Sequence, residues 1–117
     1  MSSAIIFSIV IPFKSWSPDL EECLTHIKKL SLQEFEVILL PDEKVNTPTF
    51  YQDIPISIYP TGEVNPALKR NLGVKKSIGK YLAFIDDDAY PQLDWLEIAW
   101  NTLENRDDIS AIGGPAT

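Results

Sequence analysis

Residues 80–91 read KYLAFIDDDAYP and place three consecutive aspartates directly after an apolar run. The near-continuous apolar character of residues 81–85 is typical of a strand buried on both faces of a parallel sheet. Asp86, Asp87 and Asp88 would then lie at the carboxyl end of this strand. Two like charges ~4 Å apart repel by about 1 kcal/mol in water and by about 4 kcal/mol at an effective dielectric of 20. The three carboxylates therefore favour a bound cation, and a divalent cation is the simplest choice.

The composition is that of a globular protein with one domain. The chain has 117 residues, of which 44% are hydrophobic and 23% are charged, so it can bury a sizeable core. Its 17 acidic and 10 basic residues give a formal net charge of -7. This charge argues against a nucleic-acid duplex or an anionic membrane surface as the main partner.

The cysteine count and the hydropathy of the chain indicate the cellular compartment in which the protein works. The single cysteine, Cys23, excludes an internal disulfide and suits a reducing compartment, and we expect it to be buried in a helix. The apolar residues 4–13 lack a basic n-region and are too short to span a bilayer. We therefore expect no transmembrane segment and a cytoplasmic location, with peripheral membrane association as an option for a full-length protein.

Hydrophobic periodicity predicts alternating strands and helices. Short apolar runs predict strands over residues 8–13, 35–40, 56–59, 81–85 and 109–112. Longer amphipathic segments predict helices over residues 18–30, 66–79 and 95–103. The helices are expected to begin at the N-caps Ser17, Asn65 and Asp94, with Gly79 as the C-terminal glycine of the second. The expected core positions of the helices are Leu20, Cys23, Leu24, Ile27, Leu30, Leu68, Leu72, Ile78, Leu96, Ala99, Trp100 and Leu103.

This order of elements predicts an α/β fold with an open, mostly parallel sheet and flanking helices. Ligands of such sheets bind beyond the carboxyl ends of the strands, where the strand order reverses. Residues 12–14, Asp42 and the three aspartates would meet there if the first and fourth strands are neighbours. Such a site could bind a nucleoside at one end and metal-bound phosphates at the other, with Mg²⁺ or Mn²⁺ as suitable cations. Half of all basic residues lie between Lys69 and Lys80, next to this site.

The residues by themselves leave two other interpretations open. The aspartates can be a solvated turn without a ligand. Alternatively, the chain can be a receiver-like signalling domain that is phosphorylated on an aspartate beside magnesium. Against the receiver, the acidic cluster follows the fourth strand instead of the first, and Gly113-Gly114 follows the fifth strand without a lysine. The sequence contains no GxGxxG or Walker loop, no zinc-type cysteine cluster and no serine nucleophile elbow.

Three segments carry a resemblance to a known family. They are SIVIPF at residues 8–13, EVILLPD at 36–42 and NPALKRNLGVKKSIGKYLAFIDDDAYPQLDWL at 65–96. Together they resemble the amino-terminal, nucleotide-sugar-binding half of the family-2 glycosyltransferases with the GT-A fold. The resemblance implies a metal-dependent, inverting transfer of a sugar from a nucleoside-diphosphate sugar to an acceptor hydroxyl. Mn²⁺ or Mg²⁺ would be the cofactor, and the acceptor would be a saccharide, a lipid-linked molecule or another alcohol.

The same resemblance implies roles for individual residues. In such enzymes a short acidic motif after the fourth strand, called DXD, binds the ribose and, through a metal, the diphosphate. By position Asp86 lies toward the ribose and the metal, Asp88 is the best metal ligand, and Asp87 is the variable middle residue. The remaining implied nucleotide-sugar-binding residues are Pro12 and Phe13 at the base, Asp42 at the base or ribose, and Lys69 or Arg70 facing the nucleotide.

The chain departs from the family pattern in two ways. Its second strand ends in Leu40-Pro41-Asp42, with one acid where the family commonly has two. In addition, the family's domain continues beyond Thr117, and the later part usually carries the catalytic general base. We therefore expect residues 1–117 to be the donor-binding part of a longer domain, truncated at its C-terminus, with residues 113–115 at the junction.

Overall fold

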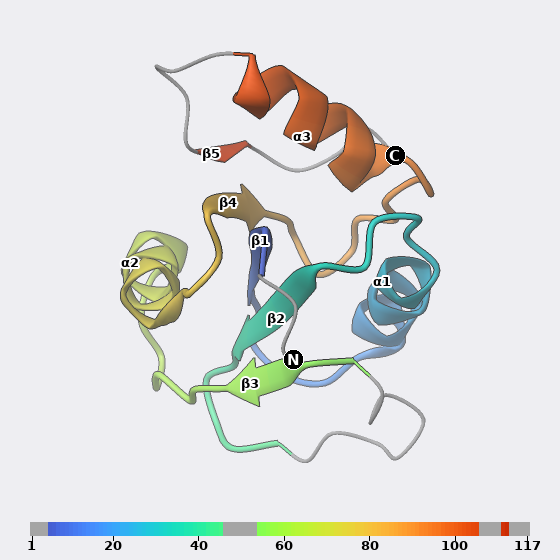
Figure 1. Cartoon of the computed structure of the whole chain (residues 1–117). Coiled ribbons are helices and arrows are strands. Elements are labelled where there is room, and N and C mark those ends of the chain that lie inside the picture. The colour runs from blue at the N-terminus through green and yellow to red at the C-terminus, as the bar shows by residue number, and fades with distance from the viewer. Residues whose placement is uncertain (1–4, 46–53, 106–110, 113–117) are drawn as a thin grey trace.

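The computed structural model describes residues 5–45, 54–105 and 111–112, and it contains the alternation of strands and helices that the sequence predicts (Figure 1). The elements are β1 (Phe7–Pro12), α1 (Pro18–Lys28), β2 (Phe35–Leu40), β3 (Ile56–Ile58), α2 (Pro66–Lys76), β4 (Tyr81–Phe84), α3 (Trp95–Glu104) and β5 (Ala111–Ile112). All strand pairings in this part of the chain are parallel. The predicted α/β fold with an open parallel sheet is confirmed.

The strand order is β3-β2-β1-β4-β5, so the first strand lies at the centre of the sheet. The chain adds β2 and β3 on one side of β1 and then crosses to the other side to form β4. β1 and β4 are direct neighbours in a register that pairs Phe7 with Tyr81 and Val10 with Phe84. The order therefore reverses between β1 and β4, as the predicted site requires. It differs from the 2-1-3-4-5 order of receiver domains, so it does not support the receiver interpretation.

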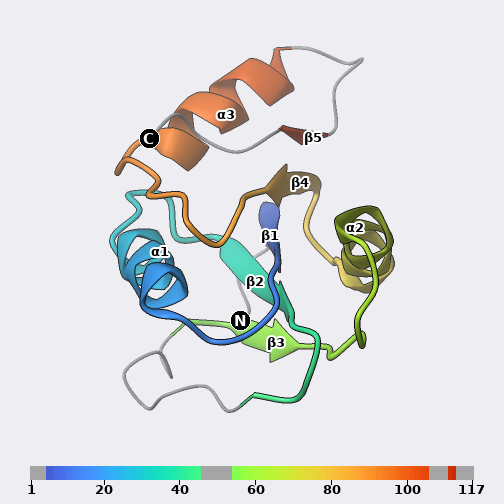
Figure 2. The ribbon, with the colours of Figure 1, turned by 180° about the vertical axis from the view of Figure 1, so that it is seen from behind.

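Helices cover both faces of the sheet (Figures 1 and 2). α1 and α3 pack on one face, where alternate residues of β1 join a large apolar cluster with Cys23 of α1 and Leu96 of α3. α2 packs on the opposite face against a smaller cluster that contains Val10 and Ile38. The expected burial of Cys23 is confirmed, because its side chain is fully buried.

Two of the three predicted N-caps form hydrogen bonds. The Ser17 hydroxyl accepts from the Leu20 N–H at 3.1 Å, and the Asn65 side-chain oxygen accepts from the Leu68 N–H at 2.9 Å. Proline occupies the next position in both helices, where its missing N–H costs no hydrogen bond. Asp94 precedes α3 as predicted, but its side chain makes no capping hydrogen bond.

The prediction for the second helix was wrong about its end and its buried face. α2 ends at Lys76, so Gly79 is not its C-terminal glycine. Leu68 and Ile78, expected in the core, are 53% and 72% exposed. The inward face of α2 instead carries Lys69 and Gly73. A Cβ on Gly73 would stand 2.5 Å from a Val10 methyl, which shows how closely the helix backbone approaches the sheet.

Two further core predictions were wrong. Trp100 of α3 is 38% exposed. β4 is buried on one face only, because Leu82 and Phe84 are partly exposed on the side that faces α2. The physical reason is the position of α2, which packs mainly on β1 and β2 and leaves this face of β4 partly uncovered. Of the predicted fifth strand, residues 111–112 are confirmed, while residues 109–110 and 113–115 lie outside the described residues.

Candidate functional site

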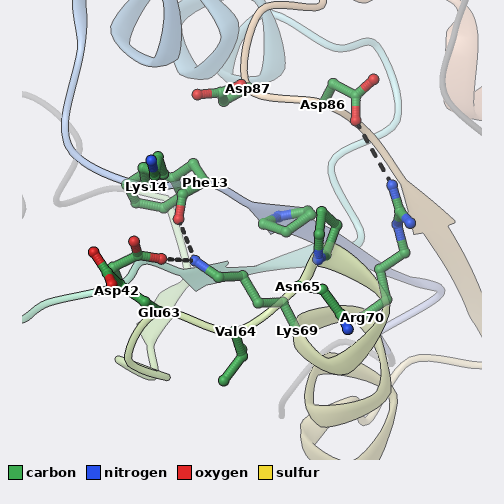
Figure 3. Close-up of a pocket in the computed structure, with 12 residues that line it drawn as sticks. Phe13, Lys14, Asp42, Glu63, Val64, Asn65, Lys69, Arg70, Asp86 and Asp87 are labelled. Carbon is green, nitrogen blue, oxygen red and sulfur yellow. Dashed lines mark hydrogen bonds and ion pairs between the residues drawn. The ribbon is translucent and has the colours of Figure 1, made fainter.

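A cleft of about 690 Å³ opens at the carboxyl edge of the sheet, where the strand order reverses (Figure 3). Its volume lies in the range of small-molecule sites. The lining residues come from the ends of β1, β2 and β4 and from the start of α2: Pro12, Phe13, Lys14, Asp42, Glu63, Val64, Asn65, Pro66, Lys69, Arg70, Asp86 and Asp87. The cleft thus brings together every residue predicted to bind the nucleotide sugar. Asp88, the first candidate metal ligand, is exposed beside the cleft and does not line it.

The floor of the cleft is built by loops that continue the hydrogen bonding of the sheet. The Asp42 N–H donates to the Lys14 carbonyl at 3.1 Å, and the Gly62 N–H donates to the Asp42 carbonyl at 2.8 Å. The Thr61 N–H donates to the Pro41 carbonyl at 2.9 Å. These bonds hold the loops after β1, β2 and β3 in a fixed order.

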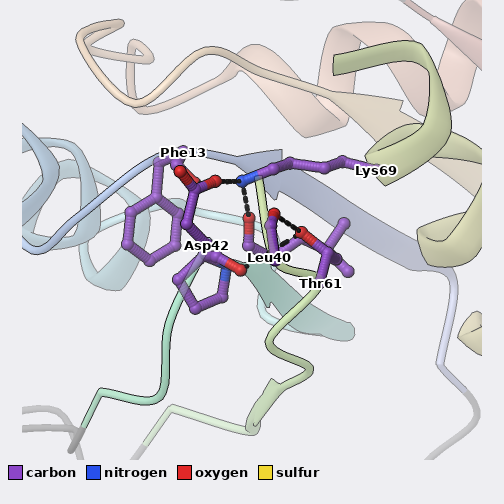
Figure 4. Close-up of polar contacts among 7 residues, drawn as sticks. Phe13, Leu40, Asp42, Thr61 and Lys69 are labelled. Carbon is purple, nitrogen blue, oxygen red and sulfur yellow. Dashed lines mark hydrogen bonds and ion pairs between the residues drawn. The ribbon is translucent and has the colours of Figure 1, made fainter. Parts of the chain in front are cut away.

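Lys69 is the most buried charged residue of the cleft, at 3% exposure. Figure 4 shows its ammonium pointing toward Asp42 and Leu40. Its ammonium donates to the Phe13 carbonyl at 2.5 Å and the Leu40 carbonyl at 3.1 Å. It also forms an ion pair with Asp42, in which Nζ lies 2.5 Å from Oδ1. A buried ammonium is tolerated only when it is paired and hydrogen-bonded, and this one has both kinds of partner. Lys69 therefore joins the ends of β1 and β2 to the first turn of α2.

Arg70 behaves differently from its neighbour in sequence. Its Nη2 lies 3.9 Å from Oδ1 of Asp86, and the two side chains are 44% and 74% exposed. An ion pair with this exposure contributes little, because water competes for both groups. The Arg70 guanidinium is thus a cation that can turn toward an anionic ligand in the cleft.

The electrostatics of the aspartates agree with the expected repulsion. Partial burial raises the pKa of Asp87 above its ordinary value, and the charges of Asp88, Asp86 and Asp19 raise it further. Among the residues that the structure describes, no three acidic, histidine or cysteine side chains are grouped to hold a metal ion by themselves. Mg²⁺ typically takes one or two carboxylates together with ligand phosphates and water, so the exposed carboxylates after β4 fit such a cation.

The net charge of the cleft also favours a cation. Its lining includes three basic residues, Lys14, Lys69 and Arg70, and four acidic residues, Asp42, Glu63, Asp86 and Asp87. An anionic ligand such as a diphosphate would enter a lining with a net negative charge. A divalent cation bound between the ligand and the aspartates would remove this repulsion.

Residues 63–66 were not predicted to be part of the site. Asn65 and Pro66 were assigned only to the start of a helix, and Glu63 and Val64 were given no role, yet all four line the cleft. Their position after a strand and before a helix was a usable signal. In a parallel sheet every such connection begins at the carboxyl edge, which is where the ligand binds.

A comparison with protein families identifies the chain. Residues 8–116 match the model described as glycosyl transferase family 2. The chain belongs to this family. Within the family it is 30% identical over 91 residues to the glycosyltransferase EpsJ of Bacillus subtilis, an alignment that covers 73% of this chain and 26% of EpsJ. The chain thus spans about a quarter of the length of this curated relative.

Solved glycosyltransferase structures share its GT-A fold. TarS residues 1–349 from S. aureus, in complex with UDP-GlcNAc, superpose with a TM-score of 0.75 at 22% identity, covering 87% of this chain and 32% of TarS. The mannosyltransferase PcManGT from Pyrobaculum calidifontis, in complex with GDP-Man and Mn²⁺, superposes with a TM-score of 0.74 at 20% identity. This alignment covers 87% of this chain and 33% of PcManGT. Within the described part of this family-2 chain, no helix has the length and apolar character needed to cross a membrane.

Proposed function

We propose that this chain is the donor-binding part of a metal-dependent, inverting glycosyltransferase. The observation that carries the proposal is the cleft at the reversal of strand order, with Asp42 at one end and the aspartates after β4 at the other. This is the arrangement expected for a nucleotide whose base and diphosphate bind at opposite ends. Structures of similar fold in complex with UDP-GlcNAc, and with GDP-Man and Mn²⁺, support it.

The proposal gives roles to five lining residues and to Asp88 beside the cleft. Pro12 and Phe13 form an apolar wall for the base, and the Asp42 carboxylate accepts a hydrogen bond from the base or ribose. Arg70 turns from Asp86 toward the diphosphate. Asp86 and Asp88 would hold Mn²⁺ or Mg²⁺ as a DXD motif, and the cation, when bound, would neutralise the departing diphosphate.

The proposed reaction is a direct displacement. The acceptor hydroxyl loses its proton to a general base, and its oxygen attacks the anomeric carbon of the donor sugar. The bond between that carbon and the diphosphate oxygen breaks, the diphosphate leaves with the electron pair, and the configuration inverts. We assign the general base to none of the described residues. A saccharide or lipid-linked acceptor and a cytoplasmic location stay predictions.

Calorimetric titration tests the proposal. With Mn²⁺ present, we expect UDP or GDP to bind the wild-type chain, and Asp88→Ala to weaken this binding about tenfold or more. Glu97→Ala is a matched control, because Glu97 is an exposed carboxylate on α3 outside the cleft. The proposal fails if neither nucleotide binds, or if Asp88→Ala binds as tightly as the Glu97 control.

A further inference from the structure

The Lys69 ammonium has no hydrogen left for a ligand. A lysine ammonium carries three N–H donors. The structure gives it three acceptors, which are the carbonyls of Phe13 and Leu40 and Oδ1 of Asp42. The side chain is also only 4% exposed. Although Lys69 lines the cleft, a nucleotide could contact its ammonium only by displacing one of these partners.

Asp42, by contrast, has one oxygen open to the cleft. Its Oδ1 is held by Lys69, and no group in the described part of the chain donates to Oδ2. None of the buried side-chain oxygens described lacks a hydrogen-bond partner, so Oδ2 must reach open space. The nearby backbone donors are already used, since the Asp42 and Gly62 N–H groups donate to carbonyls. Asp42 therefore presents one oriented acceptor to the cleft, whereas Glu63, the other carboxylate beside it, is exposed.

We propose that Lys69 is a positioning residue, which holds Asp42 so that the nucleobase is read by the single oxygen Oδ2. This inference rests on the proposed donor binding and changes the role expected for Lys69, from a ligand contact to a support. The ion pair also keeps Asp42 oriented, because Oδ1 is tied to a lysine that is itself tied to two strand ends. A fixed acceptor gains specificity from this preorganisation.

The single acceptor has a consequence for the choice of base. Uracil presents one ring N–H between two carbonyl groups. This single donor can pair with one carboxylate oxygen. Guanine presents two adjacent donors, N1–H and the 2-amino group, which match both oxygens of a carboxylate in a bidentate pair. Because Oδ1 is already shared with Lys69 and only Oδ2 is unpaired, a bidentate pair with guanine would compete with the ammonium, so we expect the cleft to favour a uracil nucleotide over a guanine nucleotide.

The test compares three probes in the presence of Mn²⁺: UDP, GDP and pyrophosphate, which has no base. We expect the wild-type chain to bind UDP about tenfold or more tightly than GDP. Lys69→Met should reduce the affinity for UDP about tenfold and bring the two nucleotides within about threefold, while pyrophosphate changes less than about twofold. Lys75→Met, which removes an exposed lysine from the same helix outside the cleft, should behave like the wild type.

Further variants keep the test decisive if Lys69→Met does not fold. Lys69→Arg retains the charge but cannot reproduce the three contacts of a compact ammonium, so it should also reduce the preference for UDP. Asp42→Asn should do the same, because an amide turned with its oxygen to Lys69 presents N–H₂ to the base. The double variant Lys69→Met with Asp42→Asn should lose no more UDP affinity than Lys69→Met alone, since both act through Oδ2.

The outcomes separate the two proposals. If none of the three probes binds, the proposed function itself fails. If UDP and GDP bind equally to the wild type, or if the Lys69 variants keep the wild-type preference, donor binding stands and the positioning role is wrong. Equal losses for all three probes would show that Lys69 only supports the fold, which also overturns the inference.

Discussion

Two buried charged side chains lie on the same face of the sheet, and they differ in what they leave free. Glu36 of β2 lies beneath the connection between α2 and β4, and Lys69 of α2 lies at the carboxyl edge of the sheet. Both are less than one-tenth exposed, and both join segments that are distant in the sequence. The hydrogen bonds of Glu36 connect protein segments to one another, whereas Asp42, the partner of Lys69, still has an oxygen open to the cleft.

The hydrogen bonds around Glu36 connect protein segments to one another. Its Oε2 accepts from the Ser8 hydroxyl at 2.6 Å and from the Ile78 N–H at 2.8 Å. The Ser8 oxygen in turn accepts from the Gly79 N–H at 2.8 Å. None of these residues lines the cleft. The cluster therefore fixes the segment that leads into β4, and hence the position of the aspartates that follow.

The two polar clusters differ in the space that the connecting chain leaves beside them. At the position of Glu36 the connecting chain packs directly on the sheet and fills the space. At the carboxyl edge the chain leaves β1 toward α1 on one face and leaves β3 toward α2 on the opposite face, so the loops diverge and leave a cleft. The polar cluster around Glu36 therefore only stabilises the fold, whereas the one around Lys69 also borders the candidate binding site.

The largest expected effect concerns Gly79, which lies against the backbone of β1. A Cβ added there would stand 2.7 Å from the Ser8 nitrogen and 2.8 Å from the Phe7 carbonyl carbon, and backbone atoms cannot move aside easily. We expect Gly79→Ala to lower the free energy of unfolding by about 3 kcal/mol, as in overpacked cores. Urea denaturation measures this change.

Gly62 supplies the matched control near the cleft. It has a φ of 80° and no atom within 4 Å of an added Cβ, so only backbone conformation limits the substitution. Gly62→Ala should reduce stability by about 1 kcal/mol. Equal losses in the two variants would contradict the view that close packing distinguishes the connection at Gly79.

A smaller effect is expected for Ser8→Ala. The change leaves the Gly79 N–H without its acceptor and removes one donor from Glu36, so stability should fall by about 2 kcal/mol. Affinity for UDP with Mn²⁺ should not change, because Ser8 takes no part in the cleft. A loss of affinity together with stability would show that the two polar clusters are coupled.

The smallest effect should have the opposite sign. Burial and neighbouring charges raise the pKa of Asp87 above its ordinary 3.8, so its ionised form destabilises the folded chain. In metal-free buffer at pH 7, Asp87→Asn should therefore increase stability, by less than about 1 kcal/mol for charges this exposed.

The pH dependence of this gain checks its cause. The gain should shrink as the pH falls through the raised pKa and vanish well below 3.8, where Asp87 is neutral in both the folded and the unfolded chain. Urea midpoints at pH 7 and pH 3 provide the measurement. A variant that is destabilised at pH 7, or a gain of equal size at both pH values, would be inconsistent with charge repulsion.

Local hydropathy patterns were sufficient to predict the buried face of a helix where that face consists of apolar residues only. The apolar positions predicted for the first helix, from Leu20 to Leu30, are all buried, because their spacing by three and four allows only one inward face. The same reasoning failed for α2. Its inward face combines a glycine with a lysine, and a hydropathy pattern cannot identify either as a core residue.

Residue patterns were sufficient to predict the order of elements, the caps at Ser17 and Asn65, and the position of the aspartates after β4. These features depend on side chains within a few residues of one another, so short segments suffice to predict them. The burial of Lys69 and the open oxygen of Asp42, by contrast, depend on long-range contacts that no short segment contains. The acceptors of Lys69 lie 27, 29 and 56 residues away in sequence, and only strand order and register bring them to one ammonium.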